Sequence, residues 1–146
     1  MVKDKAYYDS LTEEIIGCAY KVGTALGSGF LEKVYENALA IELTDTGLIV
    51  ETQKPIKVFY QEQTVGEYFA DMLVENDIIV ELKAVKAIEN IHFAQCQNYL
   101  KATGKKLGLV INFGGEKVNV RRVVNLSLIH ISEPTRLLSI SYAVFC

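Results

Sequence analysis

Apolar side chains at helical spacing mark the first part of the chain. They recur every three or four residues between Leu11 and Ala25, which predicts a first helix there. Ser10 and Glu13 stand at its start with the spacing of a capping box, in which polar side chains bond the free backbone N–H groups. After a glycine-rich break, the same spacing predicts a second helix from Phe30 to Leu43.

The period then shortens to two, which is typical of strands. Runs rich in Val and Ile, separated by turn-forming residues, predict strands over 48–51, 56–60, 65–74 and 78–82. A third helix is expected over 89–102, followed by an almost wholly apolar strand over 107–113 and a last strand over 117–124. Two helices, three or four strands, a helix and two strands together predict an α/β sandwich with a mixed sheet.

Charged residues interrupt the apolar strands at one place. Asp71 and the tripeptide Glu81-Leu82-Lys83 flank a turn expected at Asn76-Asp77. Residues two apart on a strand share a face, so Glu81 and Lys83 project together, and a hairpin would bring Asp71 beside them. Buried charge is costly unless it is paired or bound to metal, and this oxygen-rich set suits Mg²⁺. An edge hairpin with solvated charges and a surface ion pair is the alternative interpretation.

Composition limits the remaining possibilities. The chain has 146 residues, enough for one domain with a buried core, and a net charge of −3, so overall positive charge does not mark it as a nucleic-acid binder. Positive side chains do gather locally, and a patch of this kind serves either to bind substrate or only as a solvated face; its candidates are Lys105, Lys106, Arg121 and Arg122. Three scattered cysteines favour neither a zinc site nor a disulfide framework. The N-terminal residues lack the apolar run of a secretory signal, so we expect a cytoplasmic protein.

The last part of the chain differs in character from the rest. Residues 126–146 are apolar and rich in serine, and the charged residues on both sides of Pro134 leave no span long enough to cross a membrane. Residues 126–136 resemble a translated transposase mosaic end followed by a sequencing adapter, and residues 140–146 resemble the far end of that adapter. We therefore expect a domain over 1–125 and an artefactual, non-native tail over 126–146.

Two further groups of polar residues accompany the charged hairpin. Gly29, Glu32 and Tyr35 open the second helix, and Gln95 and Tyr99 lie one turn apart on the third. With Asp71, Glu81 and Lys83, these residues make the chain resemble the GxxExxY proteins, a branch of the PD-(D/E)xK nuclease superfamily, over residues 11–124. The resemblance implies a restriction-endonuclease-like core, a mixed β-sheet flanked by helices.

The resemblance also implies roles for individual residues. Asp71 and Glu81 would hold Mg²⁺ or Mn²⁺, with the Leu82 carbonyl as a third ligand and Glu32 as an outer one. Lys83 would assist the attacking water and offset negative charge. Gln95 and Tyr99 would orient the scissile phosphate or support the lysine; Tyr35 is expected to be a packing residue.

Two functions remain open on the sequence. The first is a metal-dependent nuclease that hydrolyses phosphodiester bonds of DNA or RNA, acting alone, as a homodimer or with a protein partner. The second is a catalytically silent module on the same fold that binds nucleic acid or protein, because a fold does not dictate a function. Cleavage that is lost on substitution of Glu81 or Lys83 would distinguish them.

Overall fold

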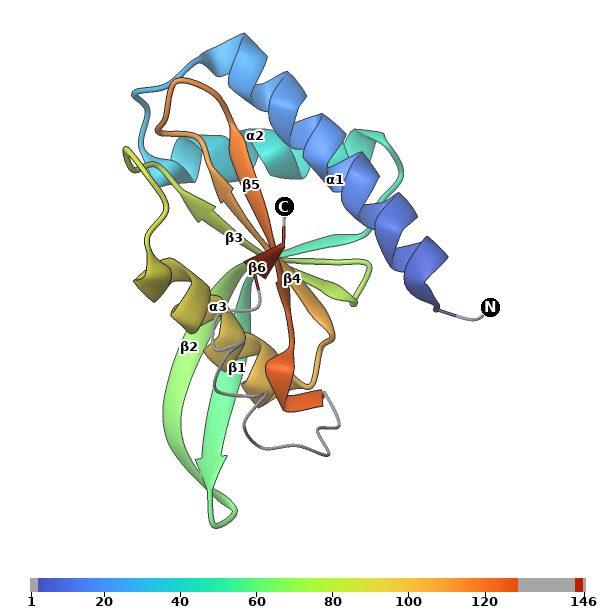
Figure 1. Cartoon of the computed structure of the whole chain (residues 1–146), viewed down its shortest axis with the longest axis vertical. Coiled ribbons are helices and arrows are strands. Elements are labelled where there is room, and N and C mark those ends of the chain that lie inside the picture. Colours follow the sequence, from blue (N-terminus) through green and yellow to red (C-terminus); the bar gives the residue numbers. More distant parts are fainter. Residues whose placement is uncertain (1–2, 129–143, 146) are drawn as a thin grey trace.

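A computed structural model describes residues 3–128 and 144–145 of the chain. Helices lie on both sides of a central sheet (Figure 1). In chain order the elements are α1 (Lys5–Leu26), α2 (Glu32–Asp45), β1 (Val50–Tyr60), β2 (Gln63–Val74), β3 (Ile78–Lys83), α3 (Asn90–Thr103), β4 (Leu107–Asn112), β5 (Asn119–Val124), the 3₁₀ turn η1 (Leu126–Leu128) and β6 (Val144–Phe145).

The sheet follows the order of the chain, β1-β2-β3-β4-β5-β6. Strands β3 and β4 run parallel and are joined by α3, whereas every other neighbouring pair is antiparallel. A parallel pair needs a long crossover connection, and α3 supplies it. The predicted α/β fold with a mixed sheet is therefore confirmed.

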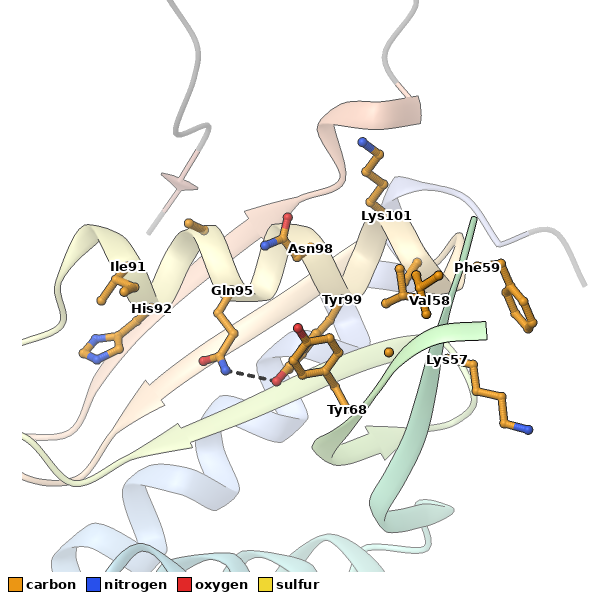
Figure 2. A pocket seen from close by; sticks show the side chains of 14 residues that line it. Lys57, Val58, Phe59, Tyr68, Ile91, His92, Gln95, Asn98, Tyr99 and Lys101 are labelled. Carbon is orange, nitrogen blue, oxygen red and sulfur yellow. Dashed lines mark hydrogen bonds between the residues drawn. The ribbon is translucent and has the colours of Figure 1, made fainter. Parts of the chain in front are cut away.

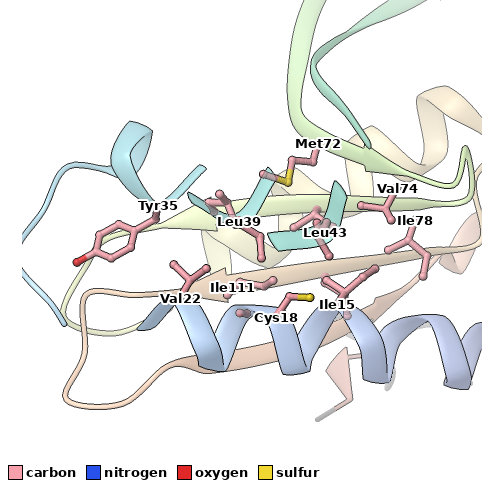
Figure 3. Packing of buried hydrophobic residues seen from close by; sticks show 14 of the residues in the cluster. Ile15, Cys18, Val22, Tyr35, Leu39, Leu43, Met72, Val74, Ile78 and Ile111 are labelled. Carbon is pink, nitrogen blue, oxygen red and sulfur yellow. The ribbon is translucent and has the colours of Figure 1, made fainter. Parts of the chain in front are cut away.

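Two apolar cores lie on the two faces of this sheet. The larger core packs α1 and α2 against the sheet through Ile15, Leu39 and Met72, all fully buried (Figure 3). The smaller core packs α3 against the other face. Alternate residues of β3 enter opposite cores, Val80 the larger and Ile79 the smaller. The strand is therefore buried on both sides, and charged residues at its end lie close to an apolar interior.

The first helix begins earlier than its spacing suggests. It starts at Lys5, and Asp4 caps it by accepting a hydrogen bond from the Tyr7 backbone N–H at 3.0 Å. The capping box predicted at Ser10 is wrong, because Ser10 lies inside the helix. The extra turns are stabilised by contacts distant in sequence, since the Tyr7 hydroxyl donates to the Asp77 carboxylate at 2.5 Å.

Strand β1 is continuous where two strands were predicted. It crosses Pro55, which is tolerated because β1 is the edge of the sheet and has no partner on its outer side among the described strands. Gln53 interrupts its regular geometry with a positive φ of 51°. The β2–β3 turn also lies one residue earlier than predicted, with Glu75 and Asn76 at positive φ. Asp77 instead directly precedes β3, and its carboxylate accepts hydrogen bonds from Tyr7 and Lys3.

The segment set apart by its composition is only partly described. The side-chain amide of Asn125 donates to the Leu100 and Lys105 carbonyls at 3.0 and 2.7 Å, which ties the end of β5 to α3 and to the loop after it. Val144 and Phe145 pair with β5, while residues 129–143 and 146 lie outside the described residues. The boundary after residue 125 stays a prediction. Within the described ranges, no helix combines the length and apolar character needed to cross a membrane.

Candidate active site

The ladder between β2 and β3 opens at two facing carboxylates. Met72 and Val80 form the last regular pair of this hairpin, and Asp71 and Glu81 follow on the two strands. Glu81 Oε2 accepts from the Asp71 backbone N–H at 2.8 Å, and Asp71 Oδ2 accepts from the Leu82 backbone N–H at 2.7 Å. Each carboxylate therefore bonds the opposite strand, and the exchange fixes both side chains where the strands diverge.

Burial makes this pair of carboxylates electrostatically unfavourable. Glu81 is only 4% exposed, and burial together with the nearby Asp71 charge raises its pKa to about 8. The pKa of Asp71 is also raised, first by burial and then by Glu36 and Glu32, while the Leu82 N–H lowers it. A buried carboxylate next to another favours a positive partner. The site is therefore suited to a cation.

Lys83 supplies one positive charge beside the pair. It follows Glu81 by two residues on β3, and its charge lowers the pKa of both carboxyl groups. Its ammonium group lies 3.4 Å from Gln95 Oε1 on α3. Gln95 Nε2 in turn donates to the Tyr99 hydroxyl at 3.0 Å (Figure 2). The lysine is thus the first member of a polar chain that continues along α3.

Helix α2 brings two more carboxylates toward the pair. Glu32 is exposed in the first turn, and its charge raises the pKa of both Asp71 and Glu81. Glu36, one turn later, is only 4% exposed. Its oxygens accept from Gln53 Nε2 at 2.8 Å and from the Lys33 ammonium at 2.5 Å. Glu36 was missed from the sequence, although its spacing from Glu32 places both on one helix face.

The residues around Glu32 fix where α2 begins. Gly29 has a φ of 113°, a conformation that side-chain-bearing residues rarely adopt. Tyr35 is fully buried, stacks on Phe113 with ring centroids 4.6 Å apart, and donates its hydroxyl to the Gly27 carbonyl at 2.5 Å. The same hydroxyl accepts from the Phe30 N–H at 3.2 Å. Tyr35 is therefore a packing residue, and it anchors the turn that presents Glu32.

The four basic residues expected to bind substrate do not gather at this site. Lys105 and Lys106 precede β4, whose opposite end faces Lys83, so about 16 Å of strand separates them from it. The Lys105 ammonium lies 3.4 Å from Asn76 Oδ1, and the Lys106 ammonium lies over the Tyr8 ring.

Arg121 and Arg122 are neighbours on β5 and project to opposite faces of the sheet. Arg122 forms an ion pair with Asp9 of α1 at 3.1 Å. The two arginines therefore do not form one patch. A substrate-binding role for any of the four basic residues stays a prediction.

Comparison with known proteins places the chain in a family. Residues 9–123 match the model of the PD-(D/E)XK nuclease superfamily. The chain belongs to that superfamily. In this superfamily member, Asp71 and Glu81-Leu82-Lys83 have the residue types and the order that the superfamily name spells out, and Ala70 precedes Asp71 where that name has proline.

Structural comparison supports the same fold for this PD-(D/E)XK protein. The crystal structure of SSO0001 is similar with a TM-score of 0.52 and 18% sequence identity, over 93% of this chain and 67% of that one. The described architecture, three helices around a mixed sheet, is a restriction-endonuclease-like α/β fold. Comparison with curated proteins gave no match.

The carboxylates of this superfamily member fit Mg²⁺ in one particular way. Within residues 3–128, no group of three or more His, Cys, Asp or Glu side chains has the geometry to hold a metal ion by itself. Mg²⁺ does not require such a cage, because it is usually held by one or two carboxylates, several waters and substrate phosphates. Asp71 and Glu81 each use one oxygen on a backbone N–H, which leaves Asp71 Oδ1 and Glu81 Oε1 as donors. The donor set therefore fits a cation shared with substrate.

Proposed function

We propose that this protein is a nuclease that hydrolyses phosphodiester bonds of DNA or RNA with Mg²⁺ or Mn²⁺. Asp71 and Glu81 would hold the ion, with the Leu82 carbonyl and Glu32 as further ligands. The main support is the pair formed by the buried Glu81 and the partly buried Asp71, which are fixed side by side where β2 and β3 diverge and both have raised pKa values. Such a pair is unfavourable without a counter-ion, and a divalent cation would relieve that cost.

Residues around the carboxylate pair would position the water and stabilise the transition state. When bound, the ion would acidify water and neutralise the phosphate. Lys83 would hold the attacking water and offset the negative charge that develops on the phosphate oxygens. Gln95 would keep the lysine in position through the bond to its amide oxygen, and Tyr99 would fix the amide in turn. Glu36, held by Lys33 and Gln53, would add negative charge behind Asp71.

The finer assignment within the superfamily is also part of the proposal. We infer a GxxExxY-type protein because Gly29 lies in the turn before α2, Glu32 begins the helix, and Tyr35 bonds that turn through its hydroxyl. Cys18 and Cys96 are free and buried, which suits the reducing cytoplasm in which we place the protein. A homodimer or a protein partner would add to substrate binding without changing these residues.

A panel of metals and substrates tests the nuclease. The full chain is incubated with single-stranded and duplex DNA and with RNA, in Mg²⁺, Mn²⁺, Ca²⁺ or chelator. We expect cleavage with Mg²⁺ or Mn²⁺, and a fall of about 100-fold or more for Glu81→Gln and for Lys83→Met. Glu67→Gln and Lys21→Met make the same chemical changes at exposed positions and should keep wild-type rates.

Two results would change the conclusion. Metal-dependent cleavage that survives both site substitutions would show that these residues are not the catalytic ones. Binding of nucleic acid without cleavage in any metal would favour the silent binding module instead. Thermal unfolding of each variant shows whether a loss of activity reflects a loss of folded protein.

A further inference from the structure

A groove of about 1050 Å³ lies beside the candidate active site, between α3 and the β1–β2 hairpin (Figure 2). Hairpin residues form one wall and α3 residues form the other. The residues that matter here are Lys57, Phe59 and Tyr68 from the hairpin and Gln95, Tyr99 and Lys101 from α3.

Aromatic rings stand exposed in this groove. Tyr68 is 50% exposed, and its ring packs against the buried Tyr99 ring with 5.7 Å between centroids. Phe59, farther along the hairpin, is 62% exposed. Exposed aromatic faces in a hollow are platforms on which unpaired bases stack, whatever their sequence.

The charge of the groove is opposite to that of the chain as a whole. The chain has 18 acidic and 15 basic residues, yet the lining that the structure describes contains two lysines and no Asp or Glu. Lys57 lies on the hairpin side and Lys101 on the helix side (Figure 2). A lining of this kind complements phosphates spaced along a strand.

The groove is continuous with the polar chain of the active site. Gln95 and Tyr99 both line it, and Gln95 also contacts Lys83. A strand lying in the groove would therefore pass next to the lysine and the carboxylate pair. The groove extends along α3 as far as Ala102, seven residues beyond Gln95, which is about 10 Å of helix.

We propose that this groove binds single-stranded nucleic acid, with bases stacked on Tyr68 and Phe59 and phosphates bound by Lys57 and Lys101. In a duplex the bases stack on one another, so their faces are not available to side chains in a groove; an unpaired segment exposes them. The inference rests on the proposed nuclease and names its substrate class as a single strand or an unpaired end.

Stacking is tested by equilibrium binding in chelator, where no cleavage occurs. Fluorescence anisotropy with labelled oligo-dT and oligo-U, and with a duplex of equal length, gives the affinity of the full chain for each. We expect both single strands to bind more tightly than the duplex, and Tyr68→Leu to weaken them about tenfold while Tyr68→Phe binds like wild type. Phe69→Leu is the matched control, because Phe69 is 49% exposed on the same strand and does not line the groove.

The lysines are tested by the salt dependence of the same binding. Each single-strand phosphate that a lysine no longer neutralises should reduce the slope of log K against log salt by about 0.7, so the double variant Lys57→Ala/Lys101→Ala should reduce it by about 1.4. The control Lys5→Ala/Lys21→Ala removes two exposed positive charges from α1 and should leave the slope unchanged.

Several results would contradict the proposal that this groove binds single strands. They are duplex binding as tight as single-strand binding, equal effects of Tyr68→Leu and Phe69→Leu, and a slope that falls with the α1 lysines or with Lys105 and Lys106 instead. The nuclease has a separate readout, because cleavage in Mg²⁺ depends on Glu81. Cleavage that is unaffected by Tyr68→Leu would refute only the proposed binding role of the groove. Tight single-strand binding without cleavage would refute only the proposed nuclease activity.

Discussion

Replacing Glu81 with glutamine tests the physical basis of the site without any substrate. The side chain keeps its shape and keeps an oxygen to accept from the Asp71 N–H, but it loses its charge. The pKa of Glu81 in the folded protein is raised from its ordinary value of 4.5 to about 8 by burial and by Asp71. Folded protein therefore binds more protons than unfolded protein between these two values, and its free energy of unfolding falls as pH rises through that window.

The magnitude follows from the shift. At about 1.4 kcal/mol per pH unit, the raised pKa of Glu81 lowers the free energy of unfolding of the metal-free protein by about 3 kcal/mol between pH 4 and pH 7. Glu81→Gln removes this cost, so the variant should be more stable than wild type near pH 8 by at least that amount. Near pH 4 the two should be about equally stable, because the wild-type carboxyl is then protonated.

Urea unfolding followed by circular dichroism, at several pH values in chelator, measures the difference directly. Subtracting the two proteins cancels the titration of the groups that do not interact with Glu81, and Glu67→Gln provides an exposed control on β2. Mg²⁺ should raise the stability of wild type most above pH 7 and should stabilise Glu81→Gln much less. A variant that is less stable than wild type at pH 8, or a difference that does not change with pH, would refute the electrostatic account of the pair.

Three further predictions concern the residues that position the site. Gly114→Ala would place a Cβ in steric overlap with the backbone of Val85, which follows Lys83 by two residues, so it should lower the free energy of unfolding by at least about 1–3 kcal/mol. Gly115→Ala is the control, because its Cβ would meet only ordinary contacts and should change the stability little. Equal urea midpoints for the two variants would contradict this. Tyr35→Phe removes the hydroxyl that bonds two backbone groups before α2 and should lower stability by about 1–3 kcal/mol; an unchanged thermal midpoint would show that the hydroxyl is not needed. Gln95→Leu should lower kcat by about 10- to 100-fold with little change in thermal stability, and wild-type kcat would exclude a positioning role.

Much of the fold followed from local pattern. Strand β4 was predicted because an apolar run of that length and composition is buried on both faces wherever it packs, and all six of its residues are buried. The β2–β3 hairpin was predicted for the same kind of reason, and it does place Asp71 beside Glu81. The start of α1 was missed because its first turns depend on a bond from Tyr7 to Asp77, seventy residues away.

The candidate site divides along the same line. Alternation on a strand is a property of the backbone, so the sequence alone placed Glu81 and Lys83 on one face. Burial of Glu36, the contact of Gln95 with Lys83 and the aromatic groove arise only where separate elements pack together. Period and spacing depend on neighbours along the chain, and they determined the elements and the charged hairpin. Burial, pKa and surface shape depend on side chains that distant parts of the chain pack against a residue, so only the tertiary structure decided those.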